Sequence, residues 1–142
     1  MRKTCVALIV MGLLASPAGA VPSGRPGDPV TGLWINPHHS VAVQNELCGN
    51  ALCGRVVWAS SGAKEDARDS GVPNLIGVDL LQDYRPRRPG EWQGTVFVPD
   101  MGHKFSSELD VLGPDRIRIS GCILHGLLCK SQVWTRIAEL PK

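Results

Sequence analysis

Short segments in which apolar and polar residues alternate are the feature that most constrains how this chain folds. Eight such segments follow residue 30, and residues typical of turns separate them. They are Thr31–Ile35, Val41–Leu47, Cys53–Ala59, Leu75–Leu81, Glu91–Val98, Lys104–Leu112, Arg116–Gly121 and Gln132–Ala138. Alternation with a period of two places one face of a strand against the core and the other against water. The sequence therefore predicts a sheet with a single buried face.

The alternation is clearest in three of these segments. In Lys104–Leu112, Phe105, Ser107, Leu109 and Val111 share one face, and charged or polar residues share the other. Ile117 and Ile119 alternate with arginines in Arg116–Gly121, and Ile76, Val78 and Leu80 share one face of Leu75–Leu81. These side chains are the predicted core of the sheet.

Most connections between the segments are too short for a parallel crossover. Asn36–His39 and Gly113–Asp115 are examples, so neighbouring strands are expected to pair antiparallel. The exception is Ser60–Asn74, where Lys64–Arg68 can form one or two helical turns that end at Gly71. Closing such a meander removes its exposed edges. We therefore expect an all-β fold, an eight-stranded antiparallel up-and-down barrel with one short helical segment in a long loop.

The first twenty residues have the pattern of a cleavable secretory signal peptide. Arg2 and Lys3 precede the apolar run Val6–Ala15, which is too short to span a bilayer, and Ala18–Ala20 is a small-x-small cleavage signature. The alternative is a retained N-terminal anchor. We expect a signal peptide over residues 1–20, a flexible Pro- and Gly-rich lead-in over 21–29 and one domain over 30–142. The expected location is periplasmic or secreted, with no transmembrane segment in the mature chain.

Removal of that segment changes both the charge and the number of cysteines. The full chain has 15 Lys and Arg residues against 13 Asp and Glu residues, so loss of Arg2 and Lys3 leaves 13 of each. A neutral chain offers no electrostatic reason to bind nucleic acid. Of five cysteines, four remain after Cys5 is lost. An even number in an exported chain favours two disulfides.

The pairing Cys48–Cys53 with Cys122–Cys129 is favoured over the crossed pairings. If Cys48 lies directly opposite Cys53 in a hairpin, Glu46 faces Arg55 and Val43 faces Trp58, which are favourable cross-strand pairs. Direct opposition of Cys122 and Cys129 would place Arg118 against Val133, so a bulge or irregular loop is expected there. These spacings lack the two-to-four-residue interval of a zinc knuckle, so zinc is the less favoured alternative, and no metal or other cofactor is expected.

Two short motifs near the ends of the domain resemble those of the calycin group, which includes lipocalins and avidins. They are Gly32-Leu33-Trp34 in the first segment and Trp134-Thr135-Arg136 in the last. In that group the tryptophan closes one end of a barrel and the basic side chain packs over its face, as a cation–π contact. The resemblance implies structural roles for Gly32, Trp34, Trp134 and Arg136.

A longer set of motifs resembles the bacterial family called domain of unknown function 2147. The motifs are Leu52–Trp58, Leu75–Gly77, Gly121–Cys122 and Leu128–Arg136, in that order. The resemblance implies a bacterial envelope protein with a lipocalin-like barrel, and it implies no established activity. This chain has Val98–Phe105 where commoner members carry Asp-Pro followed by Gly-Lys-Thr-Tyr, so a polar role for that tyrosine is in doubt.

Candidate site residues each have a plainer structural explanation. Trp58 and Trp92 are the tryptophans best suited to line an apolar ligand pocket, and Asp79 alternates within an apolar segment where it would need a partner. The arginine-rich stretch Tyr84–Pro89 can contact anionic lipids, but a solvated hairpin loop explains it more simply. Adjacent His38 and His39 diverge on a strand or turn, so they are expected to be exposed and unligated.

No catalytic residue is expected, because the serines lack a nucleophile elbow and the cysteines are expected to be oxidised. An enzyme would need carboxylates such as Asp66, Asp79 and Asp100 to converge in one cleft. We therefore expect a non-catalytic barrel in the cell envelope that binds a small apolar or amphipathic ligand. The alternative is a structural or interaction protein with a filled barrel and an envelope protein or lipid as its partner.

Overall fold

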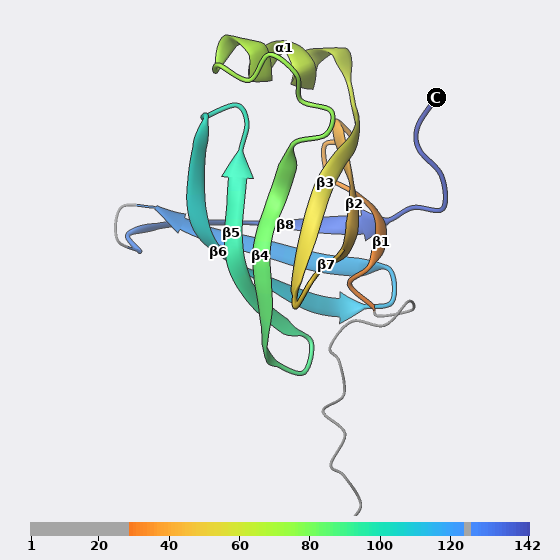
Figure 1. Cartoon of the computed structure of the whole chain (residues 1–142), viewed down its shortest axis with the longest axis vertical. Helices are drawn as coiled ribbons and strands as arrows, with labels where there is room; N and C mark the ends of the chain where they lie inside the picture. Colours follow the sequence, from red (N-terminus) through yellow and green to blue (C-terminus); the bar gives the residue numbers. More distant parts are fainter. Residues whose placement is uncertain (1–28, 124–125) are drawn as a thin grey trace, which may run out of the picture.

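Eight antiparallel strands form a closed barrel in which each strand pairs with its neighbours in sequence and β1 with β8 (Figure 1). This is a computed structural model, and it describes residues 29–123 and 126–142. The elements are β1 (Gly32–Ile35), β2 (Val41–Cys48), β3 (Ala51–Ala59), α1 (Ser61–Asp69), β4 (Asp79–Arg88), β5 (Glu91–Val98), β6 (His103–Gly113), β7 (Arg116–Ile123) and β8 (Leu128–Arg136). The predicted barrel with one short helix is confirmed. The predicted signal peptide lies outside the described residues, as does the lead-in except for Pro29.

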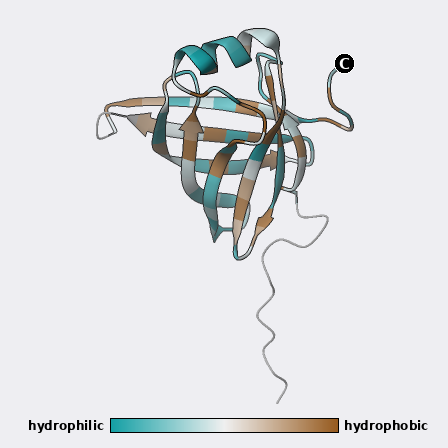
Figure 2. Cartoon of the chain, turned by 45° about the horizontal axis from the view of Figure 1, so that its top comes forward, coloured by the Kyte–Doolittle hydropathy of each residue, from teal (hydrophilic) through white to brown (hydrophobic). Residues whose placement is uncertain are grey.

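The predicted alternation sets the inner face of β6 and β7. Ser107, Leu109, Ile117 and Ile119 are buried, while Glu108 between them on β6 is exposed. Hydropathy alternates along the strands accordingly, and α1 carries mostly hydrophilic residues across one end of the barrel (Figure 2). In β6 and β7, Ser107, Leu109, Ile117 and Ile119 therefore take the buried positions that period two predicts.

The fourth strand begins later and runs further than predicted. It starts at Asp79, because Gly77 adopts a φ of +90° that interrupts extended backbone just before it. Ile76, which was expected in the core, is therefore 40% exposed. The strand continues through the arginine-rich stretch to Arg88, so the predicted hairpin loop at Tyr84–Pro89 is mostly strand.

Both hairpin registers differ from those predicted. Cys48 pairs with Ala51 across a two-residue turn in which Gly49 has a φ of +69°, so Glu46 lies opposite Cys53. Two-residue turns that contain a residue of positive φ match the twist of paired strands, which explains the shorter loop. The disulfide consequently joins diagonal rather than opposed positions.

The second hairpin contains no bulge. Cys122 lies directly opposite Cys129, and Arg118 directly opposite Val133. That mismatched pair lies on the outer face, where both residues are exposed, while Ile117 faces Trp134 on the inner face. Burial on the inner face therefore sets the register, and the outer mismatch has little influence on it.

Candidate functional site

One end of the barrel is closed by a tryptophan that lies under a guanidinium group. The Arg136 Cζ lies 4.2 Å from the centroid of the Trp34 ring. Arg136 Nη1 donates to the Thr31 carbonyl at 2.6 Å and Nε to the Pro114 carbonyl at 2.7 Å. A Cβ at residue 32 would lie only 2.6 Å from Arg136 Nη1, so glycine is needed at this position. The arginine thereby connects the segment just before β1 to the turn between β6 and β7 at this end of the barrel.

The half of the barrel next to this closed end is filled by side chains. Trp34 and Asn45 both donate to the Val30 carbonyl, at 3.0 and 3.1 Å, and all three residues are fully buried. The same half also contains six further buried side chains, those of Leu52, Leu81, Tyr84, Trp92, Leu109 and Ile117. The interior of this half is filled by these side chains, and the larger apolar cavity lies at the other end.

Tyr84 is a fully buried part of this packing, and its hydroxyl has no hydrogen-bond partner. Burial raises the pKa of Tyr84 to about 12, and the nearby Ser107 offsets part of that rise. The Ser107 hydroxyl itself donates to the Ser120 carbonyl at 2.8 Å. Tyr84 therefore stays neutral at physiological pH and acts as a packing residue.

The opposite half of the barrel is hollow. A cavity of about 750 Å³ opens there, which is within the range of small-ligand sites. Its wall is mainly apolar, with side chains from six strands and from the loop before β4. These include Val41, Leu75, Leu80, Val96, Phe105, Ile119 and Trp134. The cavity can accommodate an apolar molecule of moderate size.

Besides Asn36, His38 and Ser40 of the β1–β2 connection, the polar residues of the cavity lie on two different sides of it. Asp66 belongs to α1 and Asp100 to the turn between β5 and β6. Lys130 and Gln132 belong to β8, where they share the inner face with Trp134. Gln132 Oε1 accepts a hydrogen bond from Trp134 Nε1 at 3.2 Å. The site thus combines an apolar wall with a small number of charged groups.

Helix α1 covers the cavity end of the barrel (Figure 1). The Ser60 side chain caps it by accepting from the Ala63 backbone N–H at 3.2 Å, and Ala67 is buried against the core. At its C-terminal end, the Ser70 hydroxyl donates to the Asp100 carbonyl at 2.6 Å. The helix is therefore held to the β5–β6 turn across the mouth of the cavity.

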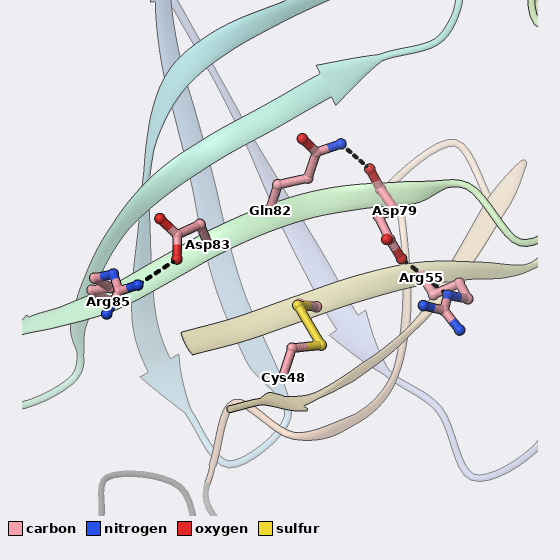
Figure 3. The surroundings of a disulfide bond; sticks show 7 residues. Cys48, Arg55, Asp79, Gln82, Asp83 and Arg85 are labelled. Carbon is pink, nitrogen blue, oxygen red and sulfur yellow. Dashed lines mark hydrogen bonds and ion pairs between the residues drawn. A yellow bond between two sulfur atoms is a disulfide. The ribbon is translucent and has the colours of Figure 1, made fainter. Parts of the chain in front are cut away.

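The three residues proposed as ligand contacts from the sequence do not line this cavity. Trp92 is buried in the packed half, and Trp58 is only partly buried on β3. Asp79 lies on the outer face, where its carboxylate accepts from Arg55 Nε at 2.9 Å (Figure 3). That hydrogen bond raises the pKa of Arg55 above its ordinary value. Among the tryptophans, Trp134 is the one that lines the cavity.

The carboxylates of Asp66, Asp79 and Asp100, which would have to meet in one cleft to form an active site, therefore do not converge. Asp66 and Asp100 line the cavity, but Asp79 pairs with Arg55 on the outside of the barrel. His38 also lines the cavity, and His39 beside it is exposed with a φ of +52°. Within residues 29–123 and 126–142, no three or more His, Cys, Asp or Glu side chains are grouped as a metal site would require.

The arginine-rich part of β4 has a partner for each guanidinium. Arg85 pairs with Asp83 at 2.9 Å (Figure 3), and Arg88 pairs with Glu91 at 3.5 Å. Arg87 donates to Gln93 Oε1 at 2.7 Å. These exposed contacts neutralise much of the local charge, as expected of a solvated strand face.

Lys130 and Gln132 are site residues that the sequence analysis missed. The last strand was predicted to begin at Gln132, whereas β8 begins at Leu128. Leu128, Lys130, Gln132 and Trp134 alternate across this boundary, and this pattern indicates in the sequence that the strand begins earlier. Because the pattern places a lysine on the inner face, this segment does not resemble a core strand.

The structure pairs Cys48 with Cys53 and Cys122 with Cys129, which is the pairing that the sequence favoured. The first disulfide joins β2 to β3, and the second joins β7 to β8 (Figure 3 shows the first). In the part of the chain that the structure describes, no helix has the length and apolar character needed to cross a membrane.

The fold and its half-hollow interior define a lipocalin-like barrel. The chain belongs to the family of uncharacterized proteins conserved in bacteria known as domain of unknown function 2147, whose family model matches residues 32–136. A similar solved structure is protein HP1028 from Helicobacter pylori, which is described as belonging to the lipocalin family. It is 12% identical, with a TM-score of 0.59 over 77% of this chain and 83% of that chain, so the likeness is one of fold. None of the curated proteins matches the sequence.

Proposed function

We propose that this protein is an exported, non-catalytic binding protein of the bacterial cell envelope that holds a small apolar or amphipathic ligand inside its barrel. The observation that carries the proposal is the cavity of about 750 Å³ with a mainly apolar wall. Removing apolar ligand surface from water would supply most of the binding free energy. The few polar groups of the cavity would orient the ligand.

Export is supported by the residue pattern of 1–20 and by the two disulfides, since disulfides persist mainly in oxidising compartments. We expect a periplasmic or secreted protein whose mature N-terminus is Val21. Intact-mass measurement of the protein from the periplasmic fraction tests this expectation. A chain that stays in the cytoplasm with residues 1–20 attached would contradict it.

The test of ligand binding is native mass spectrometry of protein purified from its bacterial host. We expect a bound mass that disappears when the protein is denatured, and extraction with organic solvent then identifies the compound. A barrel that is empty in every preparation, and that takes up no apolar compound in vitro, would overturn the proposal. It would favour the alternative of an envelope protein that acts through its outer surface.

A variant that fills the cavity separates specific binding from surface adsorption. Gly121 lines the cavity, and a Cβ there would meet the Ser106 carbonyl at 3.5 Å and a Val96 methyl at 3.8 Å, which are ordinary contacts. Gly121→Leu should therefore keep the fold and lose most of the bound ligand. Ser131→Leu, at an exposed position of β8, is the matched control and should retain it. Equal occupancy in both variants would place the ligand outside the cavity.

A further inference from the structure

The polar groups of the cavity have an asymmetry that specifies the ligand further. Lys130 is the one lysine or arginine among the residues that line the cavity in the described part of the chain. It lies on the inner face of β8 between Leu128 and Gln132. Inner faces of barrel strands normally carry apolar residues, so a lysine there calls for an explanation.

The surroundings of Lys130 leave its ammonium group accessible from the cavity. Its cross-strand neighbour on β7 is Gly121, which also lines the cavity and has no side chain to cover it. Lys130 is an exposed residue, and no carboxylate of residues 29–123 or 126–142 lies within ion-pair distance of it. By contrast, Arg55, Arg85 and Arg88 on the outer face are each paired with a carboxylate.

A second hydrogen-bond donor lies beside Lys130 on the same face. Gln132 is two residues further along β8, about 7 Å away at the backbone. Its Oε1 is occupied by the hydrogen bond from Trp134 Nε1, which leaves the amide N–H groups to donate. An ammonium group and an amide donor at this spacing can both bind the oxygen atoms of one acidic group.

The acidic residues of the cavity lie away from this pair. Asp100 is in the β5–β6 turn, and Asp66 is on α1, which Ser70 holds to that turn. Around the barrel, β8 is separated from β5 by β6 and β7. An anionic group would therefore be attracted to the β8 side of the mouth and repelled from the α1 side.

We propose that the ligand is an amphipathic anion, with a carboxylate or phosphate head on Lys130 and Gln132 and an apolar chain against Phe105, Ile119 and Trp134. This inference rests on the proposed function and names the chemical class of its ligand. The chain occupies the apolar part of the cavity, and the head stays at the mouth, where water can still solvate it in part. The head then fixes the orientation in which the chain enters.

Titration calorimetry with three matched probes tests this inference. The probes are dodecanoate, dodecyl phosphate and dodecanol, which share an apolar chain and differ in the head. We expect the preferred anion to bind about tenfold more tightly than the alcohol, which is about 1.4 kcal/mol. Comparison of the two anions shows whether a carboxylate or a phosphate is preferred. Added salt should weaken the binding of the anions and leave that of the alcohol unchanged.

The decisive variant is Lys130→Met, which removes the charge and retains an unbranched side chain. It should bind the anions about tenfold more weakly and the alcohol with unchanged affinity. Lys104→Met is the control, because Lys104 is an exposed lysine on the outer face of β6. Equal urea midpoints for the two variants would show that both remain folded.

The outcomes separate this inference from the proposed function. If all three probes bind equally well and Lys130→Met changes none of the affinities, the assignment of an anionic head is wrong, while the proposal of apolar binding in the cavity stands. If Gly121→Leu prevents binding and Lys130→Met lowers the affinity for the anions alone, both hold. If none of the probes binds to the native protein, the head assignment fails together with the apolar site.

Discussion

At Gly32, the absence of a Cβ lets Arg136 lie over Trp34 and close the barrel. The residue has a φ of +110°, and a Cβ would meet Arg136 Nη1 at 2.6 Å. Both effects disfavour any other residue here. A residue with a Cβ is strained at positive φ, and the guanidinium cannot move aside because its hydrogen bonds fix it. The glycine of the Gly-x-Trp motif is therefore explained by packing.

Replacement of this glycine should destabilise the fold. We expect Gly32→Ala to lower the free energy of unfolding by about 2 kcal/mol, measured by urea denaturation. Gly62→Ala is the matched control, because a Cβ at Gly62 on α1 meets no atom within 4 Å. That change should be neutral or stabilise by up to about 1 kcal/mol. A Gly32→Ala protein as stable as the control would contradict this account of the motif.

Tyr84 allows a direct measurement of burial in the packed half, because it is the single tyrosine of the chain. Its pKa is raised to about 12 in the folded protein, against about 10 in an unfolded chain. Tyrosinate absorbance should therefore titrate near pH 12 in buffer and near pH 10 in concentrated urea. Between these values the unfolded state loses the proton first, so folding stability should fall as pH rises through this range. A midpoint near pH 10 in the folded protein would show that the ring is solvated.

At the scale of elements, the connection between α1 and the β5–β6 turn controls how well the cavity is covered. The helix is short and mostly polar, and its buried contact is made by Ala67. The hydrogen bond from Ser70 to the Asp100 carbonyl, together with the packing of Val72 on the core, holds its C-terminal end. Such a short, exposed element opens at low free-energy cost compared with the barrel strands.

Loss of that hydrogen bond should loosen the helix selectively. For Ser70→Ala we expect faster hydrogen exchange in α1, by about fivefold for a bond worth about 1 kcal/mol, and unchanged exchange in β6 and β7. Ser61→Ala is the control, since Ser61 is exposed at the start of the same helix. If exchange in α1 were the same in both variants, the helix would be held by other contacts.

The hairpins show which interactions choose between registers. In the β7–β8 hairpin the inner pair Ile117 and Trp134 is buried, and the mismatched outer pair Arg118 and Val133 is tolerated. In the β2–β3 hairpin the two-residue turn at Gly49 replaces the longer loop expected from the cysteines. Turn geometry and inner-face burial thus outweigh favourable pairs on the outer face.

For the whole molecule, one half of the barrel supplies stability and the other half supplies space. Trp34 and the residues packed on it fill the closed half, whereas Phe105 and Trp134 border the cavity. This division lets a barrel of modest size remain folded while it keeps an interior of about 750 Å³. The cost of truncating a side chain should therefore depend on the half in which it lies.

A comparison of two truncations tests this division. Trp34→Ala should cost about 3–5 kcal/mol, because it leaves a void in close-packed surroundings. Phe105→Ala should cost about 1 kcal/mol, since one side of that ring already borders the cavity and loses few contacts. The free energies of unfolding from urea denaturation give both values. Equal losses of unfolding free energy would mean that the half with the cavity is packed as tightly as the closed half.

The sequence by itself determined that the chain forms eight strands, their antiparallel order and the inner face of β6 and β7. These follow from local patterns, since alternation and short turns act between residues close together in the chain. It also placed the short helix in the long connection, and the resemblance of Gly32-Leu33-Trp34 to the calycin motif implied which end closes. Continuation of the alternation to Leu128 would have added Lys130 to the site.

Only the tertiary structure decided where the hollow lies and which residues face it. Alternation in the sequence allows Asp79 to face the interior, but its register against Arg55 and the interruption at Gly77 place it outside. Trp92 and Trp134 are both inward tryptophans, yet one is packed and the other borders the cavity. The physical reason is that a cavity depends on the volumes of residues that meet across the barrel, and those residues are distant in sequence.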